Sequence, residues 1–145
     1  MPTFVRSVFI DAPVSVVFGF HEREDALALL SPAFPPVRLL GRSSGIEAGA
    51  RVELRVGGMK WVALHTAYEK DRLFVDEQIE GPFAKWVHRH EFENVEGKTW
   101  LTDRVEYLLP GGALVNSLLS GFTNAGLRGM FRHRHGVTKR MCERE

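Results

Sequence analysis

The middle of the chain, residues 51–109, consists of short alternating segments joined by very short turns. Apolar and polar side chains alternate along each segment, and this period of two predicts β-strands that bury one face. The turns are Gly57-Gly58, Lys70-Asp71, Gly81-Pro82-Phe83 and Glu96-Gly97. Connections of two or three residues join antiparallel neighbours, whereas parallel strands need a crossover of a dozen residues or more. The pattern therefore predicts an antiparallel meander with strands at 51–56, 59–68, 73–80, 85–95 and 98–109.

The segment before this meander predicts one strand and two short helices. Residues 3–11 alternate and predict a strand. Asp11-Ala12-Pro13 is a helix start, with Asp11 or Ala12 near the cap and Pro13 in the first turn, where its missing N–H is harmless. The apolar residues that follow predict two helices, broken near 20–24, and Ser31-Pro32 ends the second one.

A further strand and a long helix complete the expected elements. Pro35-Pro36 leads irregularly into a strand at 37–43. After Pro110-Gly111-Gly112, residues 114–141 repeat apolar side chains near a period of 3.6 and predict one long helix. Glycine weakens a helix by roughly 1 kcal/mol against alanine, so the glycines here need a reason. One explanation is that they leave room for a ligand or let the helix bend to admit it. The other is a helix that starts only after Asn116 or breaks near Gly121. The glycines are Gly121, Gly126, Gly129 and Gly136.

The order of elements predicts an α+β fold in a single domain, residues 1–145. Hairpin-joined strands form a sheet of six to seven antiparallel strands, with two short helices after the first strand. Because a twisted sheet of this size does not stay flat, we expect it to curve around the long C-terminal helix.

Turn lengths set the strand register, and the register decides which side chains share a face of the sheet. The predicted cross-strand pairs are Leu54–Trp61, Glu69–Arg72, Ala67–Phe74, His65–Asp76, Gln78–Trp86, Asp76–His88, His90–Asp103, Phe92–Leu101 and Trp86–Tyr107. One face is then mainly apolar and aromatic, and we take it as the concave face. The other carries charges of both signs and faces water. A polar row, His65–Asp76–His88, crosses the concave face beside His90–Asp103.

This face supplies the candidate functional residues. Imidazoles beside carboxylates can bind a ligand carbonyl or hydroxyl, or transfer protons, so His88, His90, Asp76 and Asp103 are the catalytic candidates. The alternative is that these groups satisfy one another beneath the helix and touch no ligand. No metal is expected, because H-x-H on one strand is common in sheets without metal. The candidate ligand-binding residues are Trp61, His65, Phe74, Asp76, Gln78, Trp86, His88, His90, Phe92, Asp103, Tyr107 and, from the helix, Phe122.

Composition and missing motifs narrow the class of function. A net charge of +1 gives no large positive field, so no nucleic-acid partner is expected. The single cysteine, Cys142, excludes a disulfide framework or a cysteine-based zinc site within one chain. No nucleotide-binding or nucleophile motif is present, and no cofactor is expected. Without a signal-peptide pattern or an apolar stretch of ~20 residues, we expect a cytoplasmic protein with no membrane span. The basic and histidine residues of 132–140 are interpreted as a solvated helix face.

The central sequence resembles a known superfamily. It reads Phe74-x-Asp76-x-Gln78-x-x-Gly81-Pro82-Phe83-x-x-Trp86-x-His88-x-His90-x-Phe92, followed by Asp103-x-Val105-x-Tyr107-x-Leu109-Pro110. This pattern resembles the bacterial ligand-binding branch of the START and polyketide-cyclase (SRPBCC) superfamily, over nearly the whole chain. The resemblance implies the helix-grip fold and an internal pocket. It implies no mechanism, because members range from carriers to cyclases, and similar domains are sometimes fused to epimerases.

Three hypotheses follow for function. The first is binding or transport of a small hydrophobic ligand, such as a lipid, polyketide or aromatic metabolite, with the His/Asp group holding its polar end. The second is a cyclase or dehydrase that uses a His/Asp pair to move a proton. The third is a ligand-free interaction module, and a homodimer or an epimerase-like protein is the partner considered. The sequence favours a binding protein over an enzyme.

Overall fold

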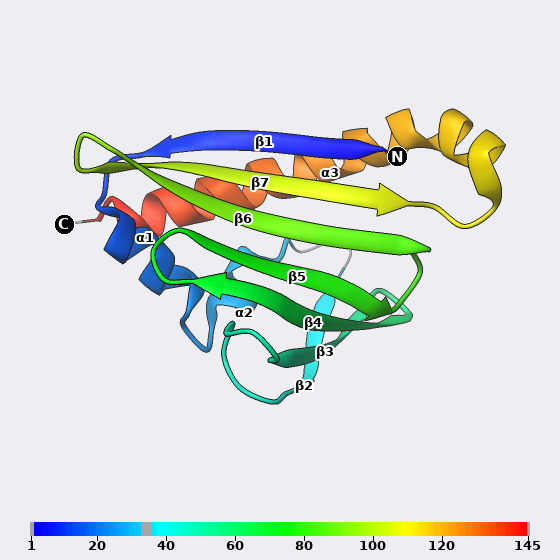
Figure 1. The fold of residues 1–145 in the computed structure, drawn as a ribbon, viewed down its shortest axis with the longest axis horizontal. Coiled ribbons are helices and arrows are strands. Elements are labelled where there is room, and N and C mark those ends of the chain that lie inside the picture. The colour runs from blue at the N-terminus through cyan, green and yellow to red at the C-terminus, as the bar shows by residue number, and fades with distance from the viewer. Residues whose placement is uncertain (1, 33–35, 145) are drawn as a thin grey trace.

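The computed structural model describes residues 2–32 and 36–144. Each predicted element is present within two residues of its expected ends, which confirms the α+β fold class (Figure 1). Pro35, in the predicted lead into the strand at 37–43, lies outside the described residues. The elements are β1 (Thr3–Ile10), α1 (Val14–His21), α2 (Ala26–Leu30), β2 (Val37–Arg42), β3 (Arg51–Val56), β4 (Met59–Glu69), β5 (Leu73–Glu80), β6 (Lys85–Val95), β7 (Lys98–Leu108) and α3 (Gly112–Cys142).

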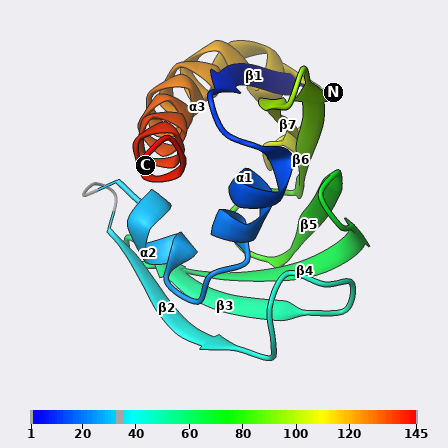
Figure 2. The same ribbon diagram turned by 90° about the vertical axis from the view of Figure 1, so that its left-hand side faces the viewer.

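One seven-stranded antiparallel sheet forms the frame of the molecule. Its strand order is β1-β7-β6-β5-β4-β3-β2, so every neighbour is the next strand in the chain except at the β1–β7 pair. Seen from its end, the sheet curves from β1 round to β2, and α3 lies across the open side (Figure 2). Of the two short helices, α2 lies between β2 and α3, and α1 lies inside the curve against β6, β7 and α3 (Figure 2). This is the helix-grip arrangement expected from the sequence.

The predicted register holds for most pairs and fails at one turn. The pairs Leu54–Trp61, His90–Asp103 and Trp86–Tyr107 are observed. At the β4–β5 turn, however, Glu69 pairs with Leu73 and Tyr68 with Phe74, so the predicted Glu69–Arg72 and Ala67–Phe74 pairs are wrong. The turn has one residue more than expected, because Asp71 takes a positive φ of 64° and Arg72 bonds back to Glu69.

A register shift between His65 and Ala67 compensates for that extra residue. Beyond the shift, His65 again pairs with Asp76 as predicted, and Asp76 pairs with His88. The β-bulge therefore keeps the three polar side chains in one cross-strand row, on the face that looks toward α3.

Buried apolar residues form two clusters under the sheet. One joins α1 to the sheet through Phe18, which is fully buried and meets Phe74 and Phe92 edge to face. The other joins α3 to the sheet through Phe131, which is also fully buried and stacks on Phe4 of β1. Aromatic pairs of this kind contribute beyond their buried area. These contacts fix both helices relative to the strands that carry the polar row.

The last helix, α3, is continuous from Gly112 to Cys142, so the alternatives of a start after Asn116 and of a break near Gly121 are both wrong. Asn116 anchors its start, accepting a hydrogen bond from Leu109 N and donating to Leu109 O. A Cβ atom at Gly121, Gly126 or Gly129 would meet no neighbour within 4 Å, so close packing does not require glycine there. The first turns extend past the ends of β1 and β7 (Figure 1). No helix among the described residues is long and apolar enough to cross a membrane.

Candidate ligand-binding site

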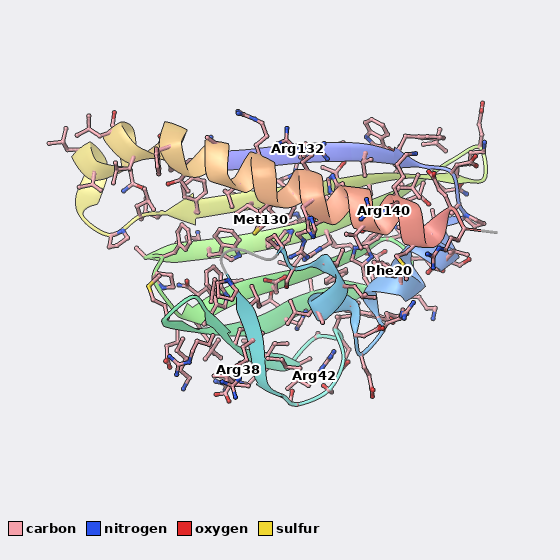
Figure 3. All side chains as sticks on the ribbon, turned by 180° about the vertical axis from the view of Figure 1, so that it is seen from behind. Phe20, Arg38, Arg42, Met130, Arg132 and Arg140 are labelled. Carbon is pink, nitrogen blue, oxygen red and sulfur yellow. The ribbon has the colours of Figure 1, made fainter. Side chains whose placement is uncertain are left out.

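A cavity of about 340 Å³ lies between the concave face of the sheet, α2 and α3. Most of its wall is apolar: α2 contributes Leu27 and Leu30, β3 contributes Val52 and Leu54, and α3 contributes Leu127 and Met130. Met130 is on the side of α3 that faces the sheet, whereas Arg132 points away from it (Figure 3). Trp61 and Trp86 also line the cavity and meet edge to face, with ring centroids 5.1 Å apart. Such a wall suits a hydrophobic ligand.

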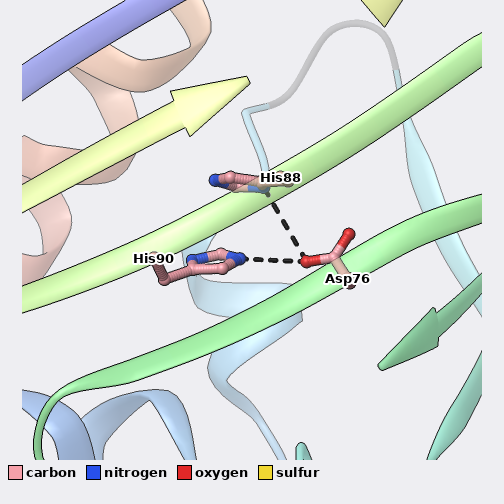
Figure 4. A group of neighbouring side chains, drawn as sticks. All are labelled: Asp76, His88 and His90. Atoms are coloured by element: carbon pink, nitrogen blue, oxygen red, sulfur yellow. Dashed lines mark hydrogen bonds and ion pairs between the residues drawn. The ribbon is translucent and has the colours of Figure 1, made fainter. Parts of the chain in front are cut away.

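Polar side chains gather on three adjacent strands of this wall. His65 on β4, Asp76 on β5, and His88 and His90 on β6 all line the cavity. His90 Nε2 donates to Asp76 Oδ2 at 2.9 Å, and His88 Nδ1 lies 3.8 Å from the same oxygen (Figure 4). The imidazoles of His88 and His90 are stacked with centroids 3.7 Å apart, and Phe74 stacks on the other side of His90 at 3.8 Å.

A second carboxylate, Asp103 on β7, lies behind the two histidines and is only 3 % exposed. It accepts hydrogen bonds from His88 Nε2 at 2.7 Å and from His135 Nε2 at 2.5 Å. Arg6 in turn donates from Nη1 to His135 Nδ1 at 2.6 Å. Since arginine only donates, Nδ1 of His135 must be the acceptor nitrogen, and Nε2 carries the proton given to Asp103. Residues from β1, β6, β7 and α3 thus form one chain of hydrogen bonds.

These contacts move the pKa values of the carboxyls and imidazoles in different directions. Burial alone would raise the pKa of Asp76 and Asp103, but hydrogen bonds from the histidines outweigh it. They lower the pKa of Asp76 to about 2, and bonds led by that from His135 hold the pKa of Asp103 well below its usual range.

The pKa values of the two stacked imidazoles are also shifted in opposite directions. Burial, and then the charge of His90, lower the pKa of His88 to about 4. Burial acts against protonation of His90 too, but its contacts with Asp103 and Asp76 prevail and raise its pKa. Hence His88 resists protonation, whereas the environment of the stacked His90 favours it.

Three imidazoles of the cavity wall each keep one ring nitrogen as an acceptor. His21 and His65 each use Nδ1 to donate to a backbone carbonyl, that of Val17 at 2.9 Å and of Ala50 at 3.2 Å. Burial is the main cause that lowers the pKa of both rings, to about 3 for His21, so each Nε2 is an acceptor. His88 donates through Nε2 and likewise leaves Nδ1 as an acceptor. Together with Asp76, these rings form a cluster of hydrogen-bond acceptors, whereas Arg23, Arg42 and Arg134 line the cavity as donors.

Comparison with known proteins assigns this fold and cavity to a family. The family model described as polyketide cyclase / dehydrase and lipid transport matches residues 10–134. The chain belongs to this family. Its members are described as cyclases, dehydrases and lipid-transport proteins, and the fold is accordingly a ligand-binding one. No curated protein matches the sequence.

Solved structures with this polyketide cyclase fold come from several bacteria. A nucleoside-diphosphate sugar epimerase from Corynebacterium glutamicum is 27 % identical with a TM-score of 0.77, over 94 % of this chain. The match takes up only 28 % of the length of that protein. A protein from Chromobacterium violaceum is 10 % identical with a TM-score of 0.74, and each chain is covered completely. A START superfamily protein from Mycobacterium smegmatis is 16 % identical with a TM-score of 0.62, over 92 % of this chain and 97 % of the other.

The structure brings seven of the twelve candidate ligand-binding residues to the cavity: Trp61, His65, Phe74, Asp76, Trp86, His88 and His90. The other five lie elsewhere. Gln78 holds the β5–β6 turn by bonds in both directions with the backbone of Phe83. Phe92 packs on Phe18, and Tyr107 donates to Asn124 on α3. Asp103 lies behind the histidines, and Phe122 is 84 % exposed on the outside of α3.

Sequence reasoning missed two histidines of the site. The basic composition of 132–140 predicts a solvated position for His135, but this residue is 2 % exposed and bonded to Asp103. The signal was present, because the buried residues of α3, Leu127, Phe131, His135, Thr138 and Cys142, recur at helical spacing. His21 ends α1 and lines the cavity beside His90, with ring centroids 6.3 Å apart. Its strand partners are not its sequence neighbours, so no pattern in the sequence reveals this contact.

Proposed function

We propose that this protein binds one compact hydrophobic ligand whose polar end donates a hydrogen bond, such as a phenol or an alcohol. The observation that carries the proposal is an apolar cavity of about 340 Å³ that contains a cluster of acceptor groups on three adjacent strands. The apolar wall supplies binding energy at roughly 25 cal/mol per Å² of buried surface. The acceptors Asp76, His88 and His65 select the polar end, since a buried acceptor without a donor is costly.

The cavity volume narrows the class of ligand. It falls near the lower end of the roughly 300–1,000 Å³ typical of small-molecule sites. A fused two-ring aromatic suits that volume, whereas a lipid with two acyl chains exceeds it. Of the hydrophobic ligands expected from the sequence, an aromatic or small polyketide-like molecule is therefore favoured. A ligand-free interaction module would fill this space with side chains. The homodimer, the epimerase-like partner and the cytoplasmic location stay predictions.

Calorimetric titration with three matched probes tests the proposal. Naphthol carries a donor, methoxynaphthalene carries an acceptor in its place, and naphthalene has neither. We expect naphthol to bind with one molecule per chain and about tenfold more tightly than the other two, as one hydrogen bond to a charged or buried acceptor contributes about 1.5 kcal/mol or more. Equal affinities for all three probes would remove the role of the acceptors, and binding of none would remove the ligand-binding proposal.

A blocked cavity provides the control for location. Ala63 lines the cavity and is 7 % exposed, so Ala63→Phe fills part of the space. Ile79 is 49 % exposed and lies outside the cavity wall, so Ile79→Phe adds the same bulk on the surface. We expect the first variant to lose naphthol binding and the second to keep it. Native mass spectrometry of freshly purified protein then gives the mass of any natural ligand.

Acid–base catalysis is the second candidate, and the geometry of His88 favours it. Its ring is oriented by Asp103, its Nδ1 is a free acceptor on the cavity wall, and burial keeps it neutral. Such a base can remove a proton from the carbon beside a ketone. Tetralone in deuterated buffer provides the test, since exchange of its α-protons is visible by NMR. Exchange at the rate of buffer alone, or equal exchange by His88→Gln, excludes this activity.

A further inference from the structure

We infer that Asp76, His88 and His90 form a binding site for a divalent transition-metal ion, with Zn²⁺ the best match. This goes beyond binding of an organic ligand, and the two can be tested separately. The three side chains offer one carboxylate oxygen and two imidazole nitrogens, whose ligand atoms all lie within 4.8 Å of one another (Figure 4). The sequence predicts H-x-H on one strand and Asp76 beside His88; the structure adds the contact of His90 with Asp76 and the groups behind the two rings.

The distances between the ligand atoms are close to those of a metal site. Asp76 Oδ2 lies 2.9 Å from His90 Nε2 and 3.8 Å from His88 Nδ1. Ligands that share a tetrahedral zinc ion at 2.0–2.2 Å lie about 3.4 Å from one another. The two observed distances straddle that value. Because the two imidazoles are stacked, each ring must turn about its Cβ–Cγ bond to point its ligating nitrogen at a common ion. Nε2 of His90 must also give up the proton that it donates to Asp76.

Asp103 acts behind these residues as the group that orients both imidazoles. It accepts a hydrogen bond from His88 Nε2, which leaves Nδ1 of that ring free to bind a metal. Asp103 Oδ1 lies 3.2 Å from His90 Nδ1, which is buried without a hydrogen-bond partner among the described residues. A turn of the His90 ring toward a metal would let this N–H donate to Asp103. A carboxylate behind a ligating histidine fixes its tautomer and strengthens the metal bond.

Charge and access also fit a divalent cation. Asp76 and Asp103 each lie within 4 Å of both rings, and a divalent cation would compensate the negative charge of these two carboxylates. Asp76, His88 and His90 all line the cavity, so a fourth coordination position faces open space where water or a ligand oxygen can bind. Three protein ligands with one open position are typical of catalytic zinc. Two nitrogens and one oxygen favour Zn²⁺ or Co²⁺ over Ca²⁺ and Mg²⁺.

Titration of the metal-free protein tests the inference. Protein treated with a chelator is titrated with ZnCl₂ by calorimetry, and with CoCl₂ by visible absorption. We expect one ion per chain, no comparable binding of MgCl₂, and the visible bands of Co²⁺ with nitrogen ligands. The double variant His88→Ala/His90→Ala should lose binding, and Asp103→Asn should weaken it about 10- to 100-fold. His133→Ala is the matched control, because His133 is exposed on α3 and does not line the cavity.

Either of two results overturns the inference: wild-type protein that binds no Zn²⁺ stoichiometrically, or binding that disappears in His133→Ala and persists in the double variant. Far-ultraviolet circular dichroism checks that each variant is folded. If the double variant or Asp103→Asn is not folded, the stoichiometry and the cobalt spectrum of the wild-type protein still test the metal site. The naphthol titration is run on metal-free protein, so that loss of one proposal leaves the other standing or falling on its own data.

Discussion

His135 Nε2 and Asp103 Oδ2 lie 2.5 Å apart and join the C-terminal part of α3 to β7, the strand next to β1 at the edge of the curved sheet. Both side chains are almost fully buried. The bond therefore ties the helix to the sheet at the same carboxylate that orients His88. Packing of α3 and the geometry of the cavity wall depend on one acidic side chain.

Replacing that side chain should destabilise the fold. In Asp103→Asn, one amide must face histidine N–H groups that now point at a carboxylate, and we expect the free energy of unfolding to fall by about 3–5 kcal/mol. Urea denaturation followed by circular dichroism measures this. Asp25→Asn is the control, since Asp25 forms an exposed ion pair with Arg23. An equal loss of stability in both variants would contradict the assigned role of Asp103.

Stability should decline as the pH falls below about 6.5, in part because of His21. Its pKa is lowered from 6.5 to about 3 by burial, so the folded state resists a proton that the unfolded state accepts. The contribution is complete above pH 6.5 and is lost progressively toward pH 3, at up to about 1.4 kcal/mol per pH unit. In His21→Leu, the free energy of unfolding should therefore fall less steeply between pH 6 and about 4, by up to about 1.4 kcal/mol per pH unit. Identical slopes for the two proteins in urea melts would exclude this contribution.

Truncation to alanine should destabilise the protein at one phenylalanine and have almost no effect at another. Phe18 is fully buried between α1 and the sheet, so Phe18→Ala leaves a cavity and should cost about 3–5 kcal/mol. Phe122 is 84 % exposed, so Phe122→Ala should leave the thermal midpoint nearly unchanged. Differential scanning calorimetry compares them. A large loss from Phe122→Ala would indicate that another molecule covers this helix face in solution.

The β6–β7 turn should accept a stabilising substitution. Glu96 has a φ of 53° and Gly97 a φ of 82°, both in the left-handed region. Asparagine adopts this region more readily than glutamate, and Asn-Gly is the preferred pair for such a turn. Glu96→Asn should raise the free energy of unfolding by about 0.5–1 kcal/mol. Gly97→Ala should lower it, and a destabilised Glu96→Asn would show that the turn gains nothing from asparagine.

The sequence predicted the strands well because tight turns leave few choices of pairing. Wherever a turn has its usual length, as at Gly57-Gly58, the register follows from it. The β4–β5 turn shows the limit, because the positive φ of Asp71 lengthens the turn by one residue and does not follow from the sequence alone. His65 and Asp76 still pair, but through a bulge that no local pattern predicts.

The site was predictable along strands and less so across elements. Alternation places His88 and His90 on the concave face from the sequence alone. Which carboxylate each ring meets depends on rotamers and twist: His90 bonds to Asp76, and His88 bonds to Asp103. Which residues of α3 face the site depends on the rotation of the helix about its axis. That rotation brings His135 under the sheet and leaves Phe122 outside.

Cys142, the single thiol of the chain, ends α3 and is packed against the apolar cluster around Phe18. It is 5 % exposed, and burial raises the pKa of its thiol to about 11. Thiol reagents attack the ionised form, so labelling must wait until the end of the helix lifts from the sheet. The rate of modification at Cys142, measured by mass spectrometry, therefore reports how often the end of α3 separates from the sheet, without any engineered probe. Slower labelling in the presence of a ligand or metal would report directly that the occupied cavity keeps the helix closed.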